Sequence, residues 1–179
     1  KVKLHYEENP YPRWRDIEKL SEESKHSISE IINSEIKPNA IFHTITNNRT
    51  KILIAGCGTG HHILTRQLYK NAEFTAIDLS LPSLSYAKRK LNELQINNVK
   101  LIQMDILEVP SLNEKFDIIE CIGVLHYLQN EDLGLKKLVS ALKKDGFLKL
   151  GLYSELGRED IIKAKNYISN SKKEIIEDD

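Results

Sequence analysis

The sequence has few of the residues that mark metal-binding, secreted or membrane-spanning proteins. Among its 179 residues there are two cysteines, Cys57 and Cys121. With no further Cys/His cluster beside them, we expect no bound metal and two free thiols, which suits a reducing, cytoplasmic compartment. No apolar run approaches the roughly 20 residues of a transmembrane helix, and no signal-peptide pattern is present, so we expect no membrane partner.

The chain also lacks an excess of charge of either sign. Its 26 lysines and arginines balance 26 aspartates and glutamates. Domains that bind nucleic acid commonly carry a basic surface that meets the phosphates, so we expect no nucleic-acid partner. The length is that of one domain and is ample for a hydrophobic core.

What the chain does have is a strand-like apolar segment that runs directly into closely spaced glycines. Residues 52–55 are apolar, and Gly56, Gly58 and Gly60 follow. This pattern predicts a buried parallel strand that ends in a tight turn, where glycines take positive φ and allow a ligand to approach the backbone. Apolar residues at helical spacing over residues 61–70 predict a helix next. The order strand, glycine loop, helix is typical of the start of a nucleotide-type binding site.

Further strands and helices alternate after this unit. Asp78 ends a second predicted strand, 22 positions after Gly56, close to the roughly 20-residue spacing of a ribose-binding acid. Asp105 ends a third strand, and a fourth leads into Cys121. Five strands alternating with helices predict an α/β fold with a parallel sheet and right-handed crossovers, whose carboxyl strand ends share one edge. The predicted strands are 52–55, 73–78, 99–104, 116–122 and 147–153, with helices at 82–95 and 132–143 and a turn at 144–146.

The G-x-G-x-G pattern at residues 56–60 resembles motif I of class I S-adenosylmethionine-dependent methyltransferases. A dinucleotide fingerprint would need a sixth-position glycine where this chain has His61, which argues against a nicotinamide-dependent oxidoreductase. The runs at 123–128 and 142–148 also resemble family motifs, so the resemblance covers about residues 50–153. It implies a three-layer α/β/α Rossmann-like fold with a five-stranded parallel core of order 3-2-1-4-5. We find no sixth or seventh strand, which many members have, and Ile54 stands where many carry an acid.

The resemblance implies S-adenosylmethionine as the cofactor, S-adenosylhomocysteine as the product, and a bacterial methyltransferase. Asp78 would accept both ribose hydroxyls, and Asp105 would accept from the adenine amino group with Ile106 against the ring. His126 and Tyr127, just after the fourth strand, are the candidate catalytic residues. The implied cofactor-binding residues are Gly56, Cys57, Gly58, Gly60, Asp78, Leu79, Asp105, Ile106 and Cys121.

Two questions stay open at this point. His126 is either a general base or a histidine that packs under the cofactor or bonds to backbone. The run Cys121–His126 differs from the Asn-Pro-Pro-Tyr of enzymes that methylate DNA bases or glutamine side chains, so we expect a small-molecule acceptor. The alternative is a catalytically silent cofactor-binding or assembly module of a larger protein.

The chain divides into three parts. Residues 1–50 are expected to form an N-terminal helical cap, with helices at 15–36 and 39–45; residues 51–153 form the core, and 154–179 a C-terminal helix and charged tail. Trp14, beside Tyr6 and Tyr11, either meets a sulfonium by cation–π attraction or anchors the segment, and we favour anchoring. Since the chain starts without methionine, we expect a processed or excised piece, or a module of a longer protein with additional domains. If the sixth and seventh strands are absent, the exposed edge of the fifth strand could instead pair with another chain in a homodimer.

Overall fold

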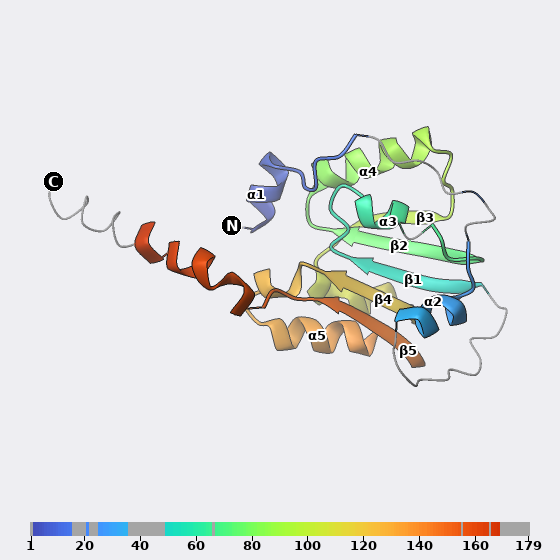
Figure 1. Cartoon of the computed structure of the whole chain (residues 1–179). Helices are drawn as coiled ribbons and strands as arrows, with labels where there is room; N and C mark the ends of the chain where they lie inside the picture. Colours follow the sequence, from blue (N-terminus) through green and yellow to red (C-terminus); the bar gives the residue numbers. More distant parts are fainter. Residues whose placement is uncertain are drawn as a thin grey trace, which may run out of the picture.

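A five-stranded parallel sheet lies at the centre of the molecule (Figure 1). The computed structural model describes residues 2–15, 21, 25–35, 49–65, 67–154, 156–164 and 166–168. The strand order is β3-β2-β1-β4-β5, and every neighbouring pair is parallel. The predicted α/β fold and its strand order are therefore confirmed. The strands are β1 (Thr50–Ala55), β2 (Ala72–Asp78), β3 (Val99–Gln103), β4 (Phe116–Ile122) and β5 (Leu142–Gly151).

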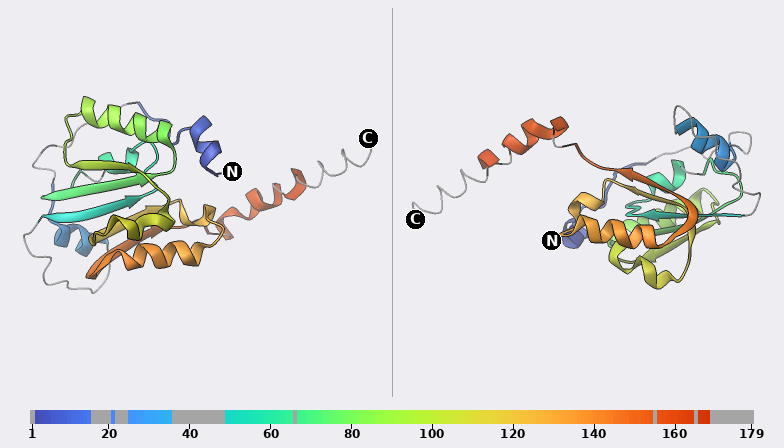
Figure 2. Two further views of the ribbon diagram at one scale, coloured as in Figure 1. Left: turned by 180° about the vertical axis from the view of Figure 1, so that it is seen from behind. Right: turned by 90° about the horizontal axis from the view of Figure 1, so that it is seen from below.

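Helices cover both faces of this sheet (Figures 1 and 2). One hydrophobic cluster joins the sheet to α2, α3 and α4 through Ile31, Ile63 and Leu84. A second joins the opposite face to η2 and α5 through Val109 and Leu138. The arrangement is the expected three-layer sandwich. The helices are α1 (Val2–Glu8), α2 (Ile28–Glu35), α3 (His61–Thr65), α4 (Leu81–Glu93), η2 (Ile106–Leu112), η3 (Leu125–Tyr127), α5 (Glu131–Ser140) and η4 (Leu156–Arg158).

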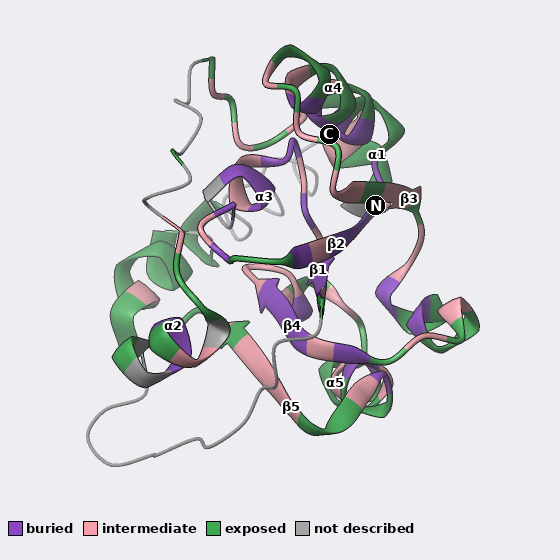
Figure 3. Cartoon of the chain, turned by 90° about the vertical axis from the view of Figure 1, so that its right-hand side faces the viewer, coloured by how far each residue is buried: buried purple, intermediate pink, exposed green. Residues whose placement is uncertain are grey.

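The middle strands form the core because each is covered on both faces. Ile52 and Leu53 of β1 and Ile119 of β4 are fully buried. Parallel strands covered by helices on both sides are expected to be apolar along their whole length rather than alternating. Burial is concentrated on β1, β2 and β4, whereas β5 at the edge is only half-buried (Figure 3).

The predicted helix over residues 15–36 is wrong in its extent. Ser21 and Lys25 are not helical, and His26 pairs with Tyr69 in an isolated bridge. The helix α2 begins only at Ile28, because Ser27 and Glu30 form a capping box: the Ser27 amide donates to Glu30 Oε2 (2.7 Å) and the Glu30 amide donates to Ser27 Oγ (3.3 Å). The helix predicted at 39–45 lies outside the described residues, as does most of 16–24.

The predicted boundaries between α5 and β5 are also wrong. The helix ends at Ser140, and β5 begins at Leu142, so that the predicted turn at 144–146 lies within the strand. The register accounts for this, because Phe116 pairs with Leu142 whereas Ile118 pairs with Phe147, leaving a bulge in β5. The helix α3 is likewise shorter than the predicted 61–70, because the chain leaves it to form the bridge at Tyr69.

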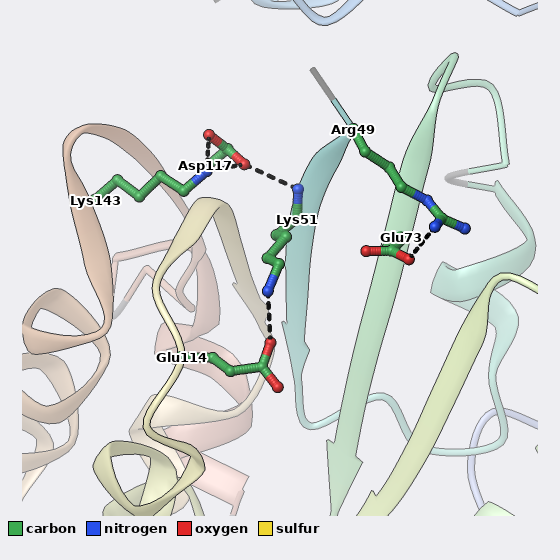
Figure 4. Close-up of polar contacts among 6 residues, drawn as sticks. All are labelled: Arg49, Lys51, Glu73, Glu114, Asp117 and Lys143. Carbon is green, nitrogen blue, oxygen red and sulfur yellow. Dashed lines mark hydrogen bonds and ion pairs between the residues drawn. The ribbon is translucent and has the colours of Figure 1, made fainter.

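Charged residues tie the amino ends of the strands together (Figure 4). The Asp117 carboxylate of β4 accepts a hydrogen bond from the backbone amide of Lys51 on β1 (2.9 Å) and from Lys143 Nζ on β5 (2.7 Å). Lys51 Nζ also reaches Glu114 (3.2 Å), and Arg49 pairs with Glu73 (2.8 Å). One carboxylate thus links three strands near their amino ends, on the side of the sheet opposite their carboxyl ends.

Two further features concern what the described residues lack. No sixth or seventh strand occurs among them, and β5 pairs only with β4 there. Within the same ranges, no helix is both long and apolar enough to cross a bilayer. The chain after β5 runs away from the sheet, through η4 and further helical residues at 159–164 (Figure 2).

Asp117→Ala is expected to lower the free energy of unfolding by about 1–2 kcal/mol, because the Lys51 amide loses its acceptor in a largely buried place. Urea denaturation followed by circular dichroism measures the change. Asp145→Ala, which removes an exposed carboxylate from the same edge of the sheet, is the matched control and should leave the midpoint in place. Equal midpoints for both variants would contradict this role of Asp117.

Candidate functional site

The loop after β1 turns sharply over the end of β2. Gly56, Gly58 and Gly60 all have positive φ, at 78°, 52° and 89°. The amides of Gly56 and Cys57 both donate to the carbonyl oxygen of Ile77 (2.9 and 3.0 Å). The expectation that these glycines adopt a left-handed backbone is confirmed, and the bend places the loop beside the second strand end.

Asp78, at the end of β2, fastens this loop. Its Oδ2 accepts from the Gly58 amide (2.8 Å), and its Oδ1 accepts from the Ser80 amide (2.9 Å). Burial raises the pKa of the Asp78 carboxyl, while the backbone amides of Ser80, Gly58 and, to a smaller extent, Leu79 oppose the rise. Because an ionised carboxylate offers about four acceptor positions, Asp78 retains capacity for two further donors.

The loop glycines also allow other segments to pack closely. A Cβ at Gly58 would lie 2.3 Å from the Tyr11 carbonyl oxygen, and one at Gly56 would lie 2.4 Å from Val124 Cγ2. A side chain at Gly58 would therefore displace the N-terminal segment. Gly123, after β4, differs because a Cβ there would meet no atom within 4 Å, although its φ is also positive at 73°.

The N-terminal segment, residues 2–15, crosses the carboxyl ends of β1 and β2. The Thr59 amide donates to the Tyr11 carbonyl (3.1 Å), and Thr59 Oγ1 donates to the Pro12 carbonyl (2.6 Å). Nearer the start of the chain, Ser80 Oγ donates to the Tyr6 carbonyl (2.9 Å). The segment is thus hydrogen-bonded to the turns that follow both strands.

Trp14 anchors the segment. Its indole Nε1 donates to Thr59 Oγ1 (3.0 Å), and its ring meets Tyr86 of α4 edge-on at 5.4 Å between centroids. Lys90 Nζ lies 5.6 Å from the indole centroid, and the Tyr86 hydroxyl donates to the Trp14 carbonyl. The contacts with α4 and the glycine loop support anchoring, the interpretation favoured for this residue.

Asp105 lies at the end of β3, as predicted, and caps η2. Its Oδ1 accepts from the Leu107 amide (2.9 Å), while its own amide donates to Glu108 (3.2 Å). Asp105 and Glu108 thus form a capping box, in which the Asp105 side chain faces the first backbone amides of η2. Ile106 is buried behind it, and Leu79 lies half-buried beyond Asp78. Both acids and both apolar residues therefore lie at the predicted edge of the sheet.

Cys57 and Cys121 are buried free thiols on neighbouring strand ends. Burial raises the pKa of Cys121 to about 12 and that of Cys57 well above its usual range, so both remain protonated at neutral pH. Their side chains pack within the two hydrophobic clusters. Any contact of these residues with a ligand therefore falls to their backbone atoms.

The two predicted catalytic residues lie side by side in η3. The His126 ring is held between Tyr127 (4.3 Å between centroids) and Tyr153 (4.1 Å), and both its nitrogens are buried without a hydrogen-bond partner among the described residues. An unpaired buried polar group costs about 1–3 kcal/mol. Burial, with the nearby positive charge of Arg158, lowers the pKa of His126, so its imidazole is neutral at pH 7.

Several residues of interest here escaped the sequence analysis. Tyr153 and Arg158 come next to His126 only through the tertiary fold, so no local pattern indicated them. Glu120 of β4 had a signal, a carboxylate within an otherwise apolar strand. It is 1% exposed, accepts from the Tyr69 hydroxyl (3.4 Å), and lies opposite Ile54, the position where the family often has an acid.

Thr59→Val removes the hydroxyl that binds both Trp14 and Pro12 but keeps the side-chain volume. We expect the N-terminal segment to loosen, with the tryptophan emission maximum moving to longer wavelength and stability falling by about 1 kcal/mol. Trp14 is the only tryptophan, so its fluorescence reports on this segment alone. Thr75→Val, at a buried threonine of β2, is the control. An unshifted spectrum in Thr59→Val would show that this hydroxyl does not hold the segment.

Comparison with known proteins agrees with this geometry. Residues 46–175 match a family described as a methyltransferase domain. The malonyl-[acyl-carrier protein] O-methyltransferase of Acetivibrio thermocellus is 32% identical over 62% of this chain and 38% of its own length. The (S)-coclaurine N-methyltransferase of Papaver somniferum is 33% identical over 54% of this chain and 28% of its own length. The chain thus spans well under half of each relative.

A solved structure extends the likeness to the fold and the ligand. Coclaurine N-methyltransferase bound to N-methylheliamine and S-adenosylhomocysteine superimposes with a TM-score of 0.53 and 30% identity, covering 57% of this chain and 30% of that one. Taken with the family match and the strand order, this shows that the chain belongs to the class I S-adenosylmethionine-dependent methyltransferases, whose cofactor is S-adenosylmethionine.

Proposed function

We propose that this chain is an active methyltransferase that transfers the methyl group of S-adenosylmethionine to a small-molecule acceptor. The observation that carries the proposal is the hydrogen bonding of Asp78. Its carboxylate holds the glycine loop through Gly58 and the next turn through Ser80, and retains two acceptor positions at the edge where parallel sheets bind ligands.

The residues at this edge have chemistry that fits the cofactor. Asp78 would hold the ribose hydroxyls, and the Asp105 carboxylate, which can accept more than one hydrogen bond, would also accept from the adenine amino group. Leu79 and Ile106 supply apolar surface for the adenine ring. The backbone of the loop and of the β4 end would complete the cradle, with Gly56, Cys57, Gly58, Gly60 and Cys121.

For methyl transfer the protein has to align the acceptor with the methyl group, exclude water and provide a base for the acceptor's proton. S-adenosylmethionine supplies a methyl group on a positively charged sulfur, which keeps the bonding electrons as the methyl leaves. The N-terminal segment, held by Thr59 and Ser80, covers the strand ends and restricts water. His126 is neutral and its ring nitrogens have no partner among the described residues, so it is equipped to take the proton of a hydroxyl or amine acceptor.

Two kinds of observation support the proposal that the acceptor is a small molecule. The run after β4, Cys121–His126, lacks the Asn-Pro-Pro-Tyr motif of enzymes that methylate DNA bases, and the chain has no net charge to attract nucleic acid. Among the relatives, (S)-coclaurine N-methyltransferase is named for a small molecule. A silent cofactor-binding module would bind S-adenosylhomocysteine equally well. It would form none of it from S-adenosylmethionine in a screen of amine, hydroxyl and carboxylate acceptors.

Asp78→Asn is expected to weaken S-adenosylhomocysteine binding by tenfold or more, since the amide turns one acceptor atom into a donor. Titration calorimetry measures the dissociation constant, and Asp132→Asn on the exposed start of α5 is the control. In the wild type, affinity should fall on acidification. Because burial raises the pKa of Asp78, its protonation begins at a higher pH than for an ordinary aspartate. If Asp78→Asn and Asp132→Asn bound S-adenosylhomocysteine with equal affinity, Asp78 would not be a cofactor-binding residue.

His126→Gln is expected to lower kcat with little change in cofactor affinity, if the imidazole takes the acceptor's proton. The direction of the pKa shift sets the pH profile. Because the pKa of His126 is lowered, the wild-type rate should decline on the acid side only below the ordinary histidine value of about 6.5, and this limb should vanish in the variant. Loss of cofactor affinity with an unchanged pH profile would instead make His126 a structural contact.

A further inference from the structure

Four aromatic rings and a guanidinium meet at one place on the carboxyl edge of the sheet. The rings are Tyr6 of α1, His126 and Tyr127 of η3, and Tyr153 after β5. Tyr6 lies 6.3 Å from Tyr127, the His126 ring contacts the rings of Tyr127 and Tyr153, and Arg158 Cζ lies 3.5 Å from the Tyr153 ring centroid. We call these five residues the aromatic cluster. Its members come from three segments far apart in the sequence.

Two members of the aromatic cluster have polar groups without protein partners. No ion pair joins Arg158 to a carboxylate among the described residues, and its guanidinium lies over the face of the Tyr153 ring. Several other surface cations do form ion pairs, as Arg49 does with Glu73 and, on the same C-terminal segment, Lys163 does with Glu159 (2.9 Å). His126 adds two buried ring nitrogens without a hydrogen bond in the described part of the chain. Together these are one positive charge and an imidazole whose hydrogen-bonding capacity the described residues do not use.

The cluster also adjoins the residues assigned to the cofactor. Val124, two positions before His126, lies against Gly56 of the glycine loop. On the other side, the Tyr6 carbonyl accepts from Ser80 Oγ, and the Ser80 amide donates to Asp78. A molecule seated on the aromatic cluster would therefore lie next to the cofactor site, which is where a methyl acceptor has to be.

We propose that the aromatic cluster is the acceptor site and that it selects acceptors bearing a carboxylate, with Arg158 binding the carboxylate and the aromatic rings packing on the acceptor's body. This assignment rests on the proposed function. A single guanidinium matches one carboxylate through two parallel hydrogen bonds, whereas a phosphate dianion would find only half its charge balanced. The contact with Tyr153 holds the guanidinium in place and so reduces the entropy lost on binding.

The test uses pairs of probes that differ only in charge. 4-Hydroxybenzoate is compared with 4-hydroxybenzamide, and hexanoate with hexanamide, by titration into the protein saturated with S-adenosylhomocysteine. The wild type should bind the carboxylate of at least one pair about tenfold more tightly than its amide. Arg158→Gln should lose this preference while its affinity for the amides and for S-adenosylhomocysteine stays the same.

Two further variants make the result specific. Arg158→Lys retains the charge without the planar fork and should restore part of the preference. Lys163→Gln removes a cation five residues away, outside the aromatic cluster, and should keep all of it. A wild type that binds S-adenosylhomocysteine but prefers neither carboxylate, or an Arg158→Gln variant that keeps the preference, would overturn this inference alone. A wild type that fails to bind S-adenosylhomocysteine would overturn the proposed function and this inference with it.

Discussion

The hydrogen bonds of Asp78 are the interaction on which the carboxyl edge of the molecule depends. One oxygen holds the Gly58 amide and the other the Ser80 amide, so a single carboxylate links the turns after β1 and β2. Ser80 in turn caps α4 through Ser83 and binds the N-terminal segment through Tyr6. Because these bonds are made to backbone amides and, at Tyr6, to a backbone carbonyl, they set the path of the chain rather than the position of one side chain.

Close packing at the glycines adds the second constraint. At Gly56 and Gly58 even a methyl group would overlap Val124 or the Tyr11 carbonyl. The glycines therefore bring the β4 turn and the N-terminal segment against the loop, in addition to opening the backbone to a ligand. This is how residues distant in sequence come to surround one place: α1, the glycine loop and η3 converge there because the loop has no side chains to keep them apart.

The amino ends and the carboxyl ends of the strands have different roles. At the amino edge, Asp117 and the charged pairs around Lys51 tie β1, β4 and β5 together and leave their own charges satisfied (Figure 4). At the carboxyl edge, Arg158 and His126 are left without polar partners among the described residues. Groups that stabilise the fold are paired, whereas groups suited to a ligand retain unused hydrogen-bonding capacity at a cost in stability.

The sequence by itself determined the order of the elements, because apolar strands, the glycine spacing of residues 56–60 and the acid at Asp78 are local patterns with local physical causes. It also placed Asp105 and His126 at strand ends. It failed at the capping box before Ile28 and at the bulge of β5, where side-chain hydrogen bonds and strand register outweighed apolar periodicity. Only the tertiary structure brought Tyr6, Tyr153 and Arg158 to His126, because contacts between separate segments depend on how the sheet and its turns pack.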